Sequence, residues 1–448
     1  MEGTVTLVNA LSDTESDRLF RRITLKIIPF LFLSYVISFL DRINIGFAQL
    51  QMKHDLVFSD AVYGLAAGMF ALGYVLLEVP SNLLLERVGA RRTFSRIMFF
   101  WGIVSSSMML VRSPGAFYAL RFLLGMCEAG FFPGIVLYLT YWYPAKRRAT
   151  VVSWFFAGVA IAGLVGGLAS GWIMQRMAGM AGLHGWQWMF LLEGAPASVL
   201  GVIAYFHLAD DPQKVSWLSG EDKRLLAQTL DVDRAAQGRD HPPTFRAALR
   251  NAKVYILAFV YFTLACGSFA ISFWVPTLIK GFGVSDLLSV GLYSAIPYGI
   301  GALGVVLISR RSDARLERRW HYLTCTVGGA AALSLLTIHG GSLALMLTIL
   351  SIAVVLVYAA MPIFWAVPPS YLGSCAAAGG IALISSIGQV GGFVSPYLIG
   401  LIKAQTGTLD NGLYLMSTLL CLGALALFLS VDDKPCKRRV SGDQIPPR

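Results

Sequence analysis

The stretch FLDRINIGF at residues 39–47 places two charged side chains, Asp41 and Arg42, at the end of a long apolar run. Moving an ionisable side chain into a hydrocarbon layer costs about 3 kcal/mol or more, so such residues usually face a protein interior or a water-filled cavity. A second pair, Arg121 and Glu128, lies in another apolar run. Their spacing of seven puts both on nearly one face of a helix, about two turns apart. We interpret these four residues as the working centre of a membrane transporter.

The composition is that of an integral membrane protein. Hydrophobic residues make up 56% of the chain and charged residues 14%, whereas soluble domains carry roughly a quarter of charged residues. The net charge is +11, but the basic residues form short clusters between apolar runs and do not share one polar face. Membrane orientation explains this pattern better than nucleic-acid binding. The expected partners are the lipid bilayer and a small molecule, with no nucleic acid.

Motifs of catalysis and of cofactor binding are absent from the sequence. It contains no Gly-x-x-x-x-Gly-Lys phosphate loop, no His-Glu-x-x-His and no Gly-x-Ser-x-Gly. The six cysteines show no spacing typical of a metal site. We therefore predict a protein that is not an enzyme and that uses no metal and no cofactor, with protons as the coupling ion. The first 24 residues lack the features of a removable signal peptide.

Twelve apolar runs are about long enough to cross a bilayer, which takes about 20 residues in a helix. The sequence therefore predicts an all-α membrane protein with twelve transmembrane helices. The runs cover residues 25–48, 60–84, 93–112, 115–141, 149–175, 186–208, 254–279, 286–309, 322–338, 343–368, 376–402 and 411–430.

The distribution of lysine and arginine predicts the orientation. With the N-terminus inside, inner segments hold 29 of the 36 basic residues. Cytoplasmic segments carry such an excess in membrane proteins. We expect a multi-pass protein of a bacterial inner membrane with both termini in the cytoplasm.

The chain divides into two halves around one long polar segment. We predict a cytoplasmic linker at 209–253 between two six-helix bundles, with short cytoplasmic tails at both ends. The bundles span residues 25–208 and 254–431, and the tails span 1–24 and 432–448.

A repeated loop supports this division. ERVGARR at 86–92 and DARLERR at 313–319 each carry an acid followed five and six residues later by two arginines. The offset is close to half the chain, which favours duplicated halves that face each other across a central cavity. We predict that these loops act as gate locks, through Glu86, Arg87, Arg91, Arg92, Asp313, Arg318 and Arg319.

These loops resemble the signature loop of the major facilitator superfamily, and further stretches resemble its anion:cation symporter branch. Residues 121–144 and 312–321 look most like carriers of the 4-hydroxyphenylacetate permease type, with tartrate, phthalate and sugar-acid carriers also similar. The resemblance implies the major facilitator fold and proton coupling by the acids that map to Asp41 and Glu128. The matching stretches are DRINIGFA at 41–48, EVPSN at 78–82, residues 121–133, GWQW at 185–188 with EG at 193–194, FWVP at 273–276, and GIAL at 380–383 with Gly388.

Arg42 is the candidate anchor for a substrate carboxylate, because a guanidinium group offers a planar, permanently charged fork. Asp41 is a candidate proton carrier. The alternative is a static ion pair that only holds helices together. Adjacent residues on a helix point about 100° apart, so Asp41 is free to pair with Arg121 instead.

The other acids of the first half divide into two kinds. Glu128 lies in the middle of an apolar run, where a carboxyl group can bind a proton on one side of the membrane and release it on the other. We expect Glu78 and Glu193 to be structural, bonding to basic loops or helix ends that hold the cytoplasmic gate closed.

The apolar runs of the second half contain no acid, so substrate contacts there must come from neutral groups. The similar carriers commonly have asparagines where Ser385 and Gln389 stand, which leaves the substrate open. Aromatic residues in such runs are more often packing residues or interface anchors. The candidates are Trp274, Trp365, Ser385, Ser386 and Gln389, with Tyr74 and Arg121 from the first half.

Glycines at 163, 167 and 171, and at 388 and 392, repeat every four residues. Small residues at this spacing let helix backbones approach closely. We expect both sets to line the contact between the two halves.

Together these observations predict a monomeric, proton-coupled secondary transporter that imports an organic carboxylate by alternating access. An aromatic acid and a sugar acid or tartrate-like acid both fit. The alternatives are an efflux transporter of the same fold and a sensor that binds without transport.

Overall fold

The computed structural model describes residues 2–236, 249–315, 317–338, 342–368 and 377–431, and this part of the chain is almost entirely helical. The first half contains α1 (Glu2–Asp55), α2 (Asp60–Val88), α3 (Ala90–Ser107), α4 (Pro114–Glu128), α5 (Phe131–Leu139), α6 (Ala145–Arg176) and α7 (Gly185–His207), followed by α8 (Gly220–Ala236). The second half contains α10 (Ala252–Gly281), α11 (Leu287–Arg315), α12 (Arg319–Leu335), α13 (Leu343–Trp365), α15 (Ala377–Gln389), α16 (Gly391–Thr406) and α17 (Asp410–Ser430).

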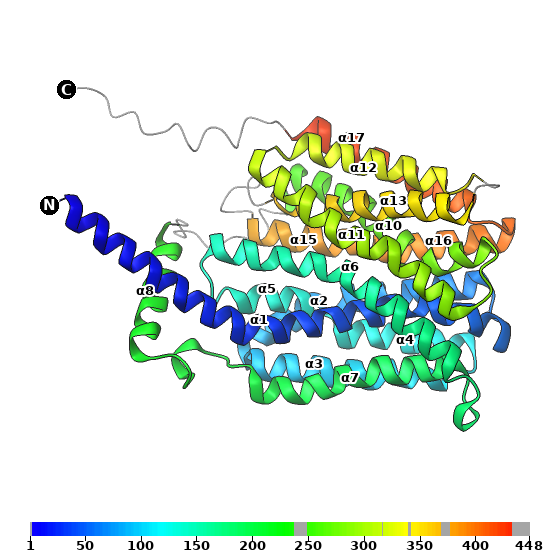
Figure 1. Ribbon diagram of the computed structural model, residues 1–448, viewed down its shortest axis with the longest axis horizontal. Coiled ribbons are helices and arrows are strands. Elements are labelled where there is room, and N and C mark those ends of the chain that lie inside the picture. Colours follow the sequence, from blue (N-terminus) through cyan, green and yellow to red (C-terminus); the bar gives the residue numbers. More distant parts are fainter. Residues whose placement is uncertain (1, 237–248, 316, 339–341, 369–376, 432–448) are drawn as a thin grey trace.

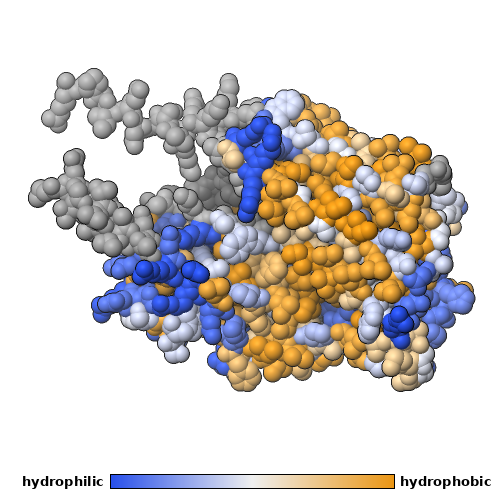
Figure 2. Space-filling model, viewed as in Figure 1, coloured by the Kyte–Doolittle hydropathy of each residue, from blue (hydrophilic) through white to orange (hydrophobic). Residues whose placement is uncertain are grey.

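The helices run side by side in two groups (Figure 1). Within the described residues, ten helical segments are long and apolar enough to cross a membrane. The shorter helices α3 and α12 bring this number to the predicted twelve. Helix α3 packs along α7, and α12 packs against α13 and α17, so both lie within the bundles. Each of the twelve apolar runs therefore has its helix, and the all-α fold is confirmed. Figure 2 shows apolar side chains covering the middle of the molecule, with hydrophilic residues gathered toward its ends.

Helix α1 begins much earlier than the apolar run at 25–48 suggests. The residues before that run continue the helix because they bury an apolar face. Leu19, Phe20 and Ile23 are buried, and the Phe20 ring stacks on Tyr143 with 5.9 Å between the ring centroids. The last part of the predicted tail, from Leu19 to Ile23, is therefore packed against the first bundle.

The run at 115–141 is not one continuous helix. Helix α4 ends at Glu128, and Gly130 adopts a left-handed backbone conformation, with φ of 83°, before α5 begins. A β-carbon at Gly130 would lie 2.6 Å from the Ser81 side chain, so both the backbone and the close packing require glycine. The break places the Glu128 carboxyl at the last residue of a helix. The run at 376–402 is likewise divided, into α15 and α16.

The two halves meet most closely at the end of the bundle away from α8, which we call the distal end. Helices α6 and α11 pack together there, as do α2 and α16. A β-carbon at Gly167 would lie 2.9 Å from the Gly291 carbonyl oxygen, and one at Gly163 would lie 2.4 Å from Tyr298. The expected contact of the α6 glycines with the other half is confirmed. Gly388, by contrast, packs on Tyr261 within its own half.

Polar contacts fasten the distal end. The Asp60 carboxylate accepts hydrogen bonds from Gln49 at 2.9 Å and from Lys53 at 2.7 Å. Lys403, from the other half, forms an ion pair with Asp60 at 3.1 Å. Thr277, also from the other half, donates to the Gln49 side-chain oxygen at 3.1 Å. We call these five side chains the distal lock, because its bonds cross from α1 and α2 to α10 and α16.

The close approach of α2 to α16 generates a prediction for Gly64→Ala. A β-carbon at Gly64 would lie 2.4 Å from the Pro396 carbonyl oxygen and 3.0 Å from the Gly400 Cα atom. Neither backbone atom can move cheaply, so we expect the distal end to stay open. Transport in proteoliposomes should fall at least about tenfold, a change of about 1.4 kcal/mol.

Gly115→Ala is the matched control, since a β-carbon at Gly115 would meet nothing within 4 Å. Alanine is also the better helix former, by about 1 kcal/mol, so loss of helix stability cannot explain a defect. Wild-type transport by Gly64→Ala would contradict the role of this contact in closure.

Candidate functional site

Arg42 and Glu128 form a buried ion pair inside the first bundle. Ser38 and Arg42 lie four residues apart on α1 and therefore share one face of the helix. The Glu128 Oε1 atom accepts from Ser38 Oγ at 2.7 Å and from Arg42 Nε at 2.8 Å, and Arg42 Nη2 lies 2.5 Å away. Three donors thus converge on one carboxylate oxygen. The second oxygen, Oε2, is buried and has no hydrogen-bond partner among the described residues.

Aromatic rings surround the Arg42 guanidinium group. Its central carbon lies 4.9 Å from the ring centroid of Phe39, 5.2 Å from that of Phe70 and 5.0 Å from that of Tyr74. A cation over the face of an aromatic ring is stabilised by the negative charge of that face. The rings and Glu128 together fix the orientation of the guanidinium group.

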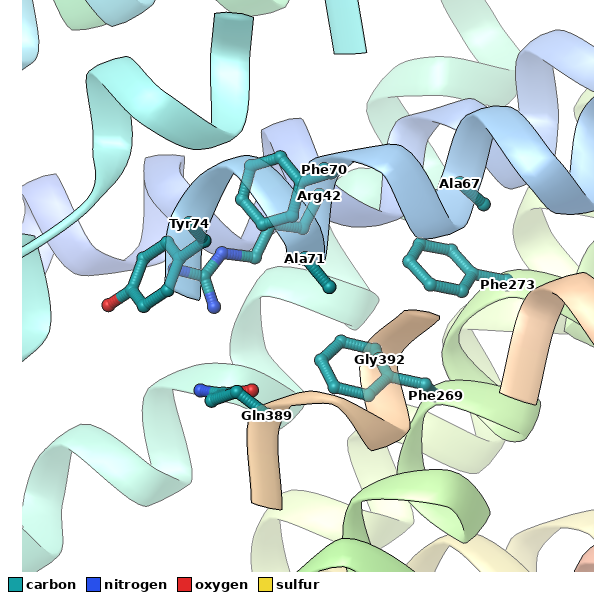
Figure 3. A pocket seen from close by; sticks show the side chains of 9 residues that line it. All are labelled: Arg42, Ala67, Phe70, Ala71, Tyr74, Phe269, Phe273, Gln389 and Gly392. Atoms are coloured by element: carbon teal, nitrogen blue, oxygen red, sulfur yellow. The ribbon is translucent and has the colours of Figure 1, made fainter. Parts of the chain in front are cut away.

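Arg42 also lines a narrow pocket between the halves (Figure 3). Arg42, Phe70 and Tyr74 come from the first half, and Phe269, Phe273 and Gln389 come from the second, with Ala67, Ala71 and Gly392 completing the wall. The volume of the pocket is about 10 Å³, which is near the minimum that holds one water molecule. An organic acid is larger, so the halves must separate to admit one.

The pocket brings together three of the candidates named from sequence, Arg42, Tyr74 and Gln389. It also contains Phe269 and Phe273, which the sequence analysis did not single out. The sequence spacing could have indicated them. Phe269 and Phe273 are four residues apart and share a helix face, as Phe70 and Tyr74 do.

The remaining candidates of the second half lie elsewhere. Ser385 and Ser386 donate to the two Glu78 carboxylate oxygens at 3.2 and 3.3 Å. Glu78 thus contacts serines of the opposite half, and the predicted contact with a basic loop or a helix end is wrong. The Trp365 ring packs on Tyr261, with 4.8 Å between the ring centroids.

Trp274 belongs to the distal end in this conformation. Its side chain is fully buried and makes an edge contact with Tyr63, with 5.1 Å between the ring centroids. The Lys403 ammonium group of the distal lock lies 5.2 Å from the Trp274 ring centroid. Trp274 does not line the pocket.

Asp41 accepts only from neutral donors. Trp101 Nε1 donates to its carboxylate at 2.5 Å, Ser105 Oγ at 2.9 Å and Asn44 Nδ2 at 3.5 Å. Neither the static pair with Arg42 nor the pair with Arg121 is formed in this structure. Arg42 pairs with Glu128 because it points away from Asp41 around the helix.

Arg121 is fully buried and largely unpaired. Its Nε atom donates to the Ala66 carbonyl oxygen at 3.4 Å, and its guanidinium carbon lies 5.1 Å from the Phe70 ring centroid. Both Nη atoms lack a hydrogen-bond partner among the described residues. A buried donor without a partner costs about 1–3 kcal/mol, and more when charged. Arg121 therefore has donors free to bind an anion or an ordered water molecule close to Phe70.

The loop after α2 contacts its own half. The Arg91 backbone N–H donates to Asp210 at 2.8 Å, and the Arg91 guanidinium carbon lies 4.1 Å from the Tyr205 ring centroid. Glu86, Arg87 and Arg92 are exposed and form no ion pair with another described side chain.

The corresponding loop after α11 makes two contacts within its own half. Arg318 donates to Ser312 at 3.1 Å, and the Arg319 guanidinium carbon lies 3.8 Å from the Phe428 ring centroid. The side chain of Asp313 is outside the described residues. In the described part of the chain, no group of three or more His, Cys, Asp or Glu residues is placed to hold a metal ion.

Known proteins have sequences and folds similar to those of this chain. Residues 31–396 match the family model described as Major Facilitator Superfamily. The Agrobacterium vitis protein named "Putative tartrate transporter" is 45% identical over 92% of this chain and 94% of its own length. The Pseudomonas putida protein named "Putative metabolite transport protein NicT" is 42% identical over 93% of this chain and 95% of its own.

A solved structure supports the fold independently of close sequence similarity. The xylose transporter XylE from E. coli, in a partially occluded inward open conformation, superposes with a TM-score of 0.72 at 14% identity. The match covers 91% of this chain and 98% of XylE. The chain therefore belongs to the major facilitator superfamily and is a multi-pass membrane transporter, not an enzyme.

Proposed function

We propose that this transporter imports an organic carboxylate together with protons by alternating access. The observation that carries the proposal is the Arg42–Glu128 pair, which lies at the wall of a pocket formed by both halves. The relative named for tartrate transport supports a carboxylate as the class of substrate.

The pair supplies a mechanism for coupling. The Glu128 carboxylate occupies two donors of Arg42, so a substrate carboxylate must compete with it. Protonation of Glu128 removes its negative charge and frees the guanidinium fork for the substrate. When Glu128 releases its proton on the other side of the membrane, the ionised carboxylate pairs with Arg42 again and displaces the substrate anion. Proton and substrate thus enter and leave together.

Orientation follows from the basic residues. Cytoplasmic segments carry the excess of lysine and arginine, which assigns the distal end to the outside. The distal lock then closes the outer entrance, and the structure corresponds to a state closed toward the periplasm. Asp41 serves as a second proton carrier in this scheme. Two or more protons per monoanion make import electrogenic, so the membrane potential drives it.

The wall of the pocket favours a planar aromatic acid over an aliphatic one. Four aromatic rings line it, and Arg42 and Gln389 are its charged and polar groups. Flat apolar surfaces gain most from stacking against a ring, whereas a polyhydroxylated acid needs several hydrogen-bonding partners. Arg42 would bind the carboxylate and the rings would hold the remainder of the molecule.

The first test is Arg42→Lys. Lysine keeps the charge but loses the planar fork that pairs with a carboxylate through two hydrogen bonds. We expect uptake of labelled carboxylate to fall about tenfold or more with expression unchanged. Arg112→Lys, at an exposed position, should transport normally. Undiminished uptake by Arg42→Lys would exclude Arg42 as the anchor.

The second test is Glu128→Gln. The amide has the shape of the protonated acid and cannot ionise, so it should leave Arg42 permanently available. We expect exchange of internal for external substrate to continue while accumulation driven by a proton gradient is lost. Glu221→Gln, in the exposed part of α8, is the matched control. Gradient-driven uptake by Glu128→Gln would place the coupling proton on another group.

The third test compares carboxylates by thermal shift of the purified protein. A ligand at a hundred times its dissociation constant adds about 2.7 kcal/mol of stability. We expect benzoate-like or hydroxyphenylacetate-like acids to raise Tm more than tartrate at equal concentration. Phe273→Ala should reduce the difference in Tm shift between aromatic acids and tartrate. Phe100→Ala, at an exposed position, should leave this difference unchanged. A larger shift with tartrate would point to a polyhydroxylated acid.

A further inference from the structure

Glu193 is a buried carboxyl group that the proposed coupling does not use. It lies on α7, inside the first bundle, with 5% of the residue exposed. Its Oε1 atom accepts from Ser170 Oγ of α6 at 2.7 Å. Its Oε2 atom is buried and has no hydrogen-bond partner among the described residues. The carboxyl group is therefore only half satisfied.

Asn44 stands between Glu193 and Asp41. The residue is 1% exposed, its Nδ2 atom donates to Asp41 Oδ1 at 3.5 Å, and the same amide group faces the Glu193 carboxyl group as a donor. Its Oδ1 atom has no donor among the described residues. Two neighbouring side chains thus each carry a buried acceptor without a donor.

One proton satisfies both acceptors. When Glu193 Oε2 carries hydrogen, it becomes a donor, and the Asn44 amide can turn its oxygen toward that hydrogen. An amide has one accepting end and one donating end, so it can bridge one protonated and one ionised carboxyl group. Rotation of the amide exchanges the two roles, because its oxygen then faces a protonated Asp41 and its nitrogen faces an ionised Glu193.

The groups around Asp41 and Glu193 favour the sharing of one proton between the two acids. From α1, Asp41 and Asn44 face Glu193, from α6 Ser170 faces it, and from α3 Ser105 packs on the adjacent Gly194. No lysine or arginine forms an ion pair with either acid among the described residues.

Only more distant charges act on this pair. Asp41 experiences the charges of Arg121 and Glu128 without a direct bond to either. Two buried carboxylates with neutral partners repel each other, so ionising both is unfavourable. The neutral groups around Asp41 and Glu193 therefore favour one bound proton for the two carboxyl groups.

We propose that Asp41, Asn44 and Glu193 form a proton-binding site inside the first bundle, separate from the Arg42–Glu128 pair, in which the two carboxyl groups share one proton through the amide. The proposal rests on the proposed function in one respect, because it assumes that transport is coupled to protons. It assigns Glu193 as the carboxyl group that shares the proton of Asp41, a role that differs from the structural one inferred from sequence.

The test measures protons per substrate in proteoliposomes, from the reversal potential at fixed pH and substrate gradients. Glu193→Gln mimics the protonated acid, so Asp41 can stay ionised beside it. Exchange of substrate should continue, while the number of protons per substrate falls by one. Glu193→Asp keeps a carboxyl group and should restore the wild-type number. Glu221→Gln should change nothing. A Glu193→Gln variant with the wild-type number would overturn the proposal.

A second measurement does not depend on transport. Infrared difference spectra across a pH titration should contain the carbonyl band of a protonated carboxyl group, which Glu193→Gln and Asn44→Leu both alter. Spectra in which neither variant changes this band would also overturn the proposal. Failure of the proposed function looks different, because the wild type itself would then move substrate without protons.

Discussion

The cost of holding charge inside a membrane protein governs this structure. Arg42 and Glu128 avoid that cost by neutralising each other, with Ser38 and a cage of aromatic rings supplying further contacts. Breaking a buried pair by removing one partner costs about 3–5 kcal/mol, since the other charge stays behind without compensation. A change in the protonation of Glu128 therefore creates a demand for another anion beside Arg42. In the proposed mechanism, substrate binding and proton binding are linked through this one cost.

Much of the site could be predicted from the sequence because charge in an apolar run is conspicuous whatever the fold. Arg42 and Glu128 were found in this way. Tyr74 and Gln389 were named as neutral candidates, and the twelve helices were predicted from the length of the apolar runs. The partners of each group could not be predicted, because they depend on how helices pack. Asp41 bonds to Trp101 of α3, and nothing in the order of residues connects these two. The left-handed turn at Gly130, which ends α4 beside Glu128, is also set by packing against Ser81.

The two halves are held together by different forces at the distal end and near the pocket. At the distal end, glycines let backbones approach so closely that a β-carbon cannot be added, and the Asp60–Lys403 ion pair adds a charged contact. Nearer the pocket, the halves are joined by weaker bonds from two serines to Glu78. Opening the distal end must therefore break extensive van der Waals contact together with an ion pair. Substrate binding has to supply this energy through contacts that form only as the pocket closes around it.

Helix α1 connects the Arg42–Glu128 pair to the network of Asp41, Asn44 and Glu193. Asp41 and Arg42 are neighbours in sequence, yet they point about 100° apart, one toward α3 and the other toward α4. Any rotation of α1 that moves Arg42 in the pocket also displaces Asp41 and Asn44 against Glu193. The neutral network inside the bundle and the charged pair near the pocket therefore both include residues of α1. If substrate binding at Arg42 moves this helix, both sets of contacts change.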